Sequence, residues 1–119
     1  MDVLYDIERV REVTDLVRTL DLEASIAAGR AAASAIALRD RAKRCDRLSA
    51  IMEARLNRNG GRDQPRLMAA LQRSLTRAYW ATLRAGHDAL VAERAKRIFE
   101  RAERFLLRLH HEMDLRTRN

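Results

Sequence analysis

Clusters of basic side chains are the feature of this sequence that most clearly indicates a binding function. Four of them recur at helical spacing with Asp40 as the single acid among them: Arg39, Lys43, Arg44 and Arg47. Arg58 would extend this face along a continuous helix to about 30 Å, at 1.5 Å per residue. Cationic helix faces can neutralise the phosphates of a duplex without reading its bases. We predict that this face binds a nucleic-acid duplex or similar polyanion, and the alternative is an ordinary solvated helix surface.

A second basic row occupies the last third of the chain: Arg94, Arg97, Arg101, Arg104 and Arg108. Glutamates precede two of these arginines by four residues, a spacing that favours ion pairs on a helix: Glu93–Arg97 and Glu100–Arg104. The row also borders apolar positions, which arginine stems can cover as flanking residues do in coiled coils. We predict that the row assists polyanion binding. The alternative is an interhelical flank that faces acids of the first helical stretch, such as Glu8, Glu12 and Asp15.

Trp80 lies among arginines, with Arg73, Arg77 and Arg84 near it at helical spacing. Because a single aromatic residue is a poor platform for stacked bases, we predict that Trp80 packs in an interface instead. The predicted interface contains Trp80, Val91, Ile98, Phe105 and Leu109. A buried tryptophan often dominates an interface, so the second functional hypothesis is a protein-interaction module, such as an adaptor, chaperone or regulator.

Residues capable of catalysis or metal binding are few. Cys45 is the single cysteine and lies on an apolar stripe, which predicts a buried structural thiol and excludes an internal disulfide. His110 and Asp114 are one helical turn apart, but the chain contains no Glu-x-x-His pair of the di-iron type. Nucleotide-binding and hydrolase motifs are also missing. We expect a non-enzymatic protein without cofactor or metal, and a metal- or cofactor-binding bundle is the third hypothesis.

The composition indicates an all-α protein. Of 119 residues, 47% are apolar and 4% aromatic, with one proline and four glycines. The net charge of +7 is uneven, because residues 1–28 carry −4 and residues 29–119 carry +11. The apolar runs are too short for a membrane span, and a single cysteine is typical of a reducing compartment. We therefore predict a soluble cytoplasmic protein.

Helical periodicity predicts how these residues are positioned. A first stretch covers about Asp2–Leu20, and Asp21 can cap a second stretch that continues to about Asn57. Residues 57–65, NRNGGRDQP, form the one clear turn, with the chain reversal at Gly60–Gly61. Asp63 or Gln64 would begin the next helix, with Pro65 in its first turn.

The apolar stripe after Pro65 changes side near Gly86. The earlier stripe contains Leu67, Leu71, Leu75, Ala78, Thr82 and Gly86, and the later one contains Val91, Ile98, Ala102, Phe105, Leu109 and Met113. Either Gly86 ends a helix, or one helix buries opposite sides, the second against another chain. We expect a single domain, residues 1–119, that forms an antiparallel bundle of three or four helices. This bundle should be elongated and homodimeric.

Overall fold

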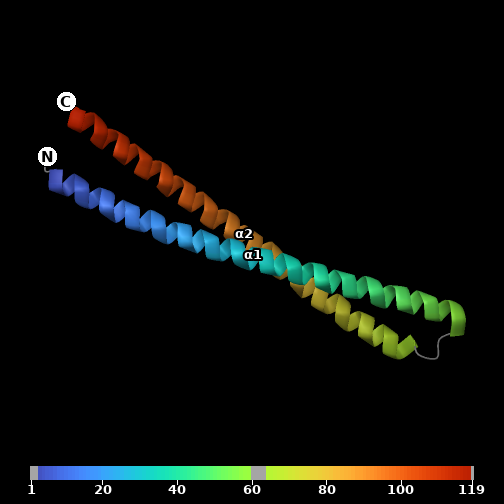
Figure 1. Ribbon diagram of the computed structural model, residues 1–119. Helices are drawn as coiled ribbons and strands as arrows, with labels where there is room; N and C mark the ends of the chain where they lie inside the picture. The colour runs from blue at the N-terminus through green and yellow to red at the C-terminus, as the bar shows by residue number, and fades with distance from the viewer. Residues whose placement is uncertain (1–2, 60–63, 119) are drawn as a thin grey trace. The chain divides into compact units, whose positions relative to one another are not determined.

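The computed structural model describes residues 3–59 and 64–118, which form two helices, α1 (Val3–Asn59) and α2 (Gln64–Arg118) (Figure 1). The prediction of three or four helices is wrong, because the chain is a helical hairpin. α1 continues through Asp21, and α2 continues through Gly86. An isolated aspartate or glycine inside a helix costs only about 1 kcal/mol or less relative to alanine, so neither residue ends its helix.

The reversal between the helices agrees with the predicted turn where the structure describes it. α1 ends at Asn59, and α2 begins at Gln64 with Pro65 as its second residue. Proline is favourable there because the first helical residues need no intrahelical partner for their N–H groups. Gly60, Gly61 and Asp63, on which the rest of that prediction depends, lie outside the described residues.

The chain forms two compact units, each made of one segment of each helix. Unit 1 contains residues 1–29 and 90–119, and unit 2 contains residues 30–89. The segments are antiparallel in unit 2, where Ser34 is hydrogen-bonded to Asp88 and Cys45 lies against Ser74. In unit 1, Arg116 Nη1 donates to Asp6 Oδ2 at 2.8 Å, which joins the beginning of α1 to the end of α2.

The two segments of each unit meet along a seam with a seven-residue repeat. Seam residues are half-buried or buried and, except at the exposed Arg41, they alternate at spacings of three and four, the pattern of a coiled coil. In α1 they are Val10, Val13, Val17, Leu20, Ala24, Ala27, Ala31, Ser34, Leu38, Cys45, Leu48 and Met52. In α2 they are Leu67, Leu71, Ser74, Ala78, Ala81, Ala85, Asp88, Ala92, Ala95, Phe99, Ala102, Leu106, Leu109 and Met113.

The seam of α2 keeps the same repeat on both sides of Gly86, so the predicted change of side is wrong for contacts within the chain. Leu67, Leu71 and Ala78 were predicted in the stripe and do lie in the seam. Leu75, Thr82 and Gly86 of that stripe are exposed, as are Val91, Ile98 and Phe105 of the later one. Alanines fill the seam around Gly86, so a stripe traced through large apolar residues departs from it there.

The seam buries few side chains deeply. Among the described residues, only Ala27, Cys45 and Ser74 are buried, and no large side chain is fully buried. The burial of Cys45 confirms the sequence prediction, and its Sγ lies 3.1 Å from Ser74 Oγ, within hydrogen-bond distance. A pair of helices has only one shared face, so most side chains retain contact with solvent.

Candidate nucleic-acid interface

The two units differ sharply in charge. Residues 30–89 hold 13 arginines and lysines against five acids, a balance of +8. Residues 1–29 and 90–119 hold 11 against 12, a balance of −1, so the two balances give the +7 of the whole chain. The hairpin places the acidic beginning of α1 beside the basic end of α2, and these charges cancel within unit 1. The excess positive charge of the chain therefore belongs to unit 2.

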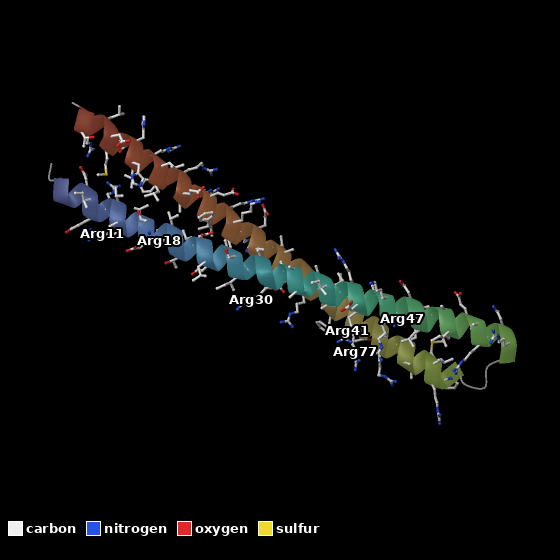
Figure 2. The ribbon with its side chains drawn as sticks, viewed as in Figure 1. Arg11, Arg18, Arg30, Arg41, Arg47 and Arg77 are labelled. Carbon is white, nitrogen blue, oxygen red and sulfur yellow. The ribbon has the colours of Figure 1, made fainter. Side chains whose placement is uncertain are left out.

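Unit 2 contains an open groove between its two helical segments, with a volume of about 810 Å³. Its lining residues from α1 are Arg30, Ala33, Ser34, Ala37 and Arg41, and those from α2 are Arg77, Trp80, Ala81, Arg84 and Asp88. Figure 2 labels three of these arginines, Arg30, Arg41 and Arg77, on the two helices of the unit. The groove thus combines four guanidinium groups with one carboxylate.

The seam determines how these side chains are positioned. Alanines at positions 33, 37 and 81 contribute only methyl groups, which leaves the space open between the longer side chains. Ser34 Oγ donates a hydrogen bond to Asp88 Oδ2 across the two helices. The seven-residue repeat predicts a seam residue at position 41, but Arg41 is exposed there and lines the groove. A long cationic side chain is better solvated there than in the seam.

The four arginines of the groove are available for an anion. None of Arg30, Arg41, Arg77 and Arg84 forms an ion pair with another of the residues that the structure describes. Asp88, the one acid of the groove, already accepts the hydrogen bond from Ser34. Guanidinium groups have a planar fork of donors that matches phosphate and carboxylate oxygens. The groove can therefore neutralise several negative charges at once.

A smaller hollow continues the groove along α1. It is lined by Ala37, Asp40, Arg41, Arg44 and Arg47, and shares Ala37 and Arg41 with the groove. From Arg30 to Arg47 the cationic surface extends 17 residues, about 25 Å along the helix at 1.5 Å per residue. We call the groove and this hollow together the basic groove.

Trp80 lies on the edge of the basic groove and is 63% exposed. Its ring stacks edge-on against Tyr79, with 5.7 Å between the ring centroids. Within this chain Trp80 is therefore not packed in an interface between helices. A contact with another chain stays a prediction.

Only part of the basic groove was predicted from the sequence. Among the predicted residues, Arg44 and Arg47 line the basic groove. Arg39, Lys43 and Arg58 were also predicted, but they are exposed and do not line it. The prediction missed the four residues that contribute most of the charge: Arg30, Arg41, Arg77 and Arg84. The seven-residue repeat is the signal that identifies them, because Arg30, Arg77 and Arg84 each come one residue before a seam residue and Arg41 occupies a seam position.

The second arginine row lies in unit 1, where its five members are exposed. The predicted pair between Arg97 and Glu93 is confirmed, with 3.3 Å between Nε and Oε1. The described residues show no ion pair between Glu100 and Arg104. They show none between the row and the acids of α1 predicted to face it: Glu8, Glu12 and Asp15.

The remaining predicted interface residues differ in burial. Leu109 is half-buried in the seam between α1 and α2, so it already has a partner in its own chain. Val91, Ile98 and Phe105 lie beside the seam and stay exposed. Within the part of the chain that the structure describes, no three His, Cys, Asp or Glu side chains are grouped as metal ligands would be.

No protein-family model, curated protein or solved structure shows significant similarity to this chain. Within the described residues, neither helix has a stretch long and apolar enough to cross a membrane.

Proposed function

We propose that unit 2 binds a nucleic-acid duplex through its phosphate backbone, without catalysis and without reading the base sequence. The observation that supports this is the basic groove, where Arg30, Arg41, Arg77 and Arg84 gather from both helices without ion pairs. Arg44 and Arg47 extend the same surface. The +8 balance of the unit adds a long-range attraction for any polyanion.

The dimensions of the groove suit a polymer of phosphates better than a single small anion. A duplex carries one negative charge per 1.7 Å of its axis, so about 15 phosphates lie within the roughly 25 Å length of the groove. Arginines separated by seven residues on one helix, such as Arg77 and Arg84, stand about 10 Å apart. They would contact different phosphates, and each contact releases condensed counterions from the duplex.

The test compares two matched variants with the unsubstituted protein. The groove variant carries Arg30→Gln, Arg41→Gln, Arg77→Gln and Arg84→Gln. The control variant removes four exposed charges from unit 1 by Arg9→Gln, Arg11→Gln, Arg18→Gln and Lys96→Gln. Both lose the same net charge. Binding to labelled double-stranded DNA, double-stranded RNA and a single strand is measured by fluorescence anisotropy at low salt, and circular dichroism verifies helicity.

We expect the unsubstituted protein to bind a duplex. The affinity should fall more than tenfold in the groove variant and less than threefold in the control variant. Equal losses in both variants would contradict it, because net charge alone would then explain binding. Absence of duplex binding at low salt would also refute it. If the single strand binds more tightly than either duplex and Trp80→Ala abolishes that preference, base stacking replaces duplex recognition.

A further inference from the structure

Unit 1 exposes a regular apolar row on α2. Val91, Ile98 and Phe105 recur every seven residues, and they are 42%, 52% and 42% exposed. Each comes one residue before a half-buried seam residue, so the row runs along one edge of the seam. Exposed apolar side chains that recur along one edge of a folded chain indicate a site of protein contact.

Unit 2 shows which positions of the seven-residue repeat lie on the same side of the seam in a pair of these helices. There the basic groove marks one side, and the residues that line it define the repeat positions on that side. In α1 these positions include Arg30 and Ala33, and in α2 they include Trp80 and Arg84. Steps of seven residues along the same helices give the equivalent positions in unit 1.

The equivalent positions in unit 1 bring apolar residues from both helices to one side. Steps from Arg84 lead to Val91, Ile98 and Phe105, and steps from Arg30 and Ala33 lead back to Leu16 and Ile26. Leu16 is 53% exposed and Ile26 is 49% exposed. We call this surface of Leu16, Ile26, Val91, Ile98 and Phe105 the apolar side of unit 1.

The same side of unit 1 carries charges of opposite sign on its two helices, with bases on α2 and mainly acids on α1. Steps of seven from Trp80 lead to Arg94, Arg101 and Arg108 on α2, whereas the positions on α1 carry Glu12 and Glu23. Arg9 is the one base at those positions in residues 3–29, so acids predominate on α1. None of these three arginines forms an ion pair with another of the described residues. When two copies of this surface face each other across a two-fold axis, the arginines of one copy can therefore lie opposite the glutamates of the other.

We propose that a second copy of the chain covers the apolar side of unit 1, in a two-fold dimer where each α2 packs against the α1 of the other copy. In an isologous interface the same patch meets itself, so the arginines of one copy face the glutamates of the other, twice. The result is a four-helix bundle whose interior holds the apolar side of both copies. This inference is independent of the proposed nucleic-acid binding, which belongs to unit 2.

Charge reversal tests the dimer with its own internal control. The acidic variant carries Arg94→Glu, Arg101→Glu and Arg108→Glu, and the basic variant carries Glu12→Arg and Glu23→Arg. Each variant alone brings like charges together at both contacts, whereas a mixture of the two restores opposite charges at both. Molar mass is measured by sedimentation equilibrium at micromolar concentration, and circular dichroism shows whether each variant stays helical.

The unsubstituted protein should sediment with twice the chain mass of 13.7 kDa. The dissociation constant of the dimer should be at least about tenfold higher for each variant alone, and the equimolar mixture should form dimers again. A monomeric unsubstituted protein would overturn the proposal. It would also be overturned by dimers that both variants retain, or by a mixture that stays monomeric although both variants are helical.

Discussion

The strongest quantitative prediction concerns how salt weakens duplex binding by the basic groove. Each phosphate that a protein neutralises adds about −0.9 to the slope of log K against log salt concentration. The four arginines that line the groove from both helices, one phosphate each, contribute roughly −3.6 to this slope. Through these four contacts alone, the affinity for a duplex should fall about 150-fold between 50 and 200 mM salt.

Single substitutions resolve the contribution of each arginine. Arg30→Gln, Arg41→Gln, Arg77→Gln and Arg84→Gln, made one at a time, should each make the slope less steep by about 0.9, so that the same salt change costs about 3.5-fold less affinity than in the unsubstituted protein. The groove arginines lie in no ion pair among the described residues, so each substitution removes a phosphate contact without breaking an ion pair between these residues. Fluorescence anisotropy titrations at four salt concentrations measure the slopes.

The outer face of α1 is the control for this series. Arg39 and Lys43 are exposed but do not line the groove, and their substitution by glutamine should leave the slope within 0.3 of the original. If these two substitutions lower the slope by 0.9 each and the groove substitutions do not, the duplex lies across the outer face instead. That result would refute the assignment of the groove.

Three further predictions follow from the helices themselves. Gly86→Ala should raise stability by about 0.5–1 kcal/mol in urea denaturation, because Gly86 lies inside α2 and an added Cβ would meet nothing within 4 Å beyond the adjacent residues and backbone of its own helix. Ser74→Ala should lower stability by about 1 kcal/mol in the same assay, because it leaves the Cys45 thiol without its 3.1 Å partner. The fourfold groove variant should melt at a higher temperature than the unsubstituted protein at low salt, since like charges about 10 Å apart repel by about 0.4 kcal/mol per pair in water. Added sulfate should remove this difference, and a melting temperature unaffected by the arginines would contradict it.

The all-helical class and the start of α2 were predicted correctly from the sequence, whereas the number of helices was not. Gln64 and Pro65 begin α2 as expected, because proline fits a helix start and nowhere else in a helix. Asp21 was predicted as a cap because aspartate favours that position, yet the seam runs on through Leu20 and Ala24 on the same side. Packing along a continuous seam outweighs a local capping preference of about 1 kcal/mol.

The candidate site was harder to predict because its residues come from both helices. Arg44 and Arg47 could be found from α1 alone, as members of one basic face. Arg30 and Arg77 join them only through the alignment of α1 against α2, which depends on the alanines of the seam. A stripe traced through leucine, valine and isoleucine overlooks alanines, although small seam residues allow close approach of two helices.

The hairpin also favours one order of folding, because contacts farther from the turn join residues that are farther apart in the sequence. Cys45 and Ser74 are 29 residues apart in sequence, Ser34 and Asp88 are 54 apart, and Asp6 and Arg116 are 110 apart. Closing the longest of these loops directly costs about 1.2 kcal/mol more than closing the shortest. Contacts near the turn should therefore form first and bring the next pair together, as a zipper closes.

The reverse process determines where the chain first opens. Unit 1 contains the chain ends and the contacts of greatest separation, so its amides should exchange with solvent hydrogen before those of unit 2. A hydrogen-exchange experiment that finds the amides around Cys45 and Ser74 protected last would agree with closure from the turn. A protein that folds in this order presents its basic unit before its neutral unit is complete.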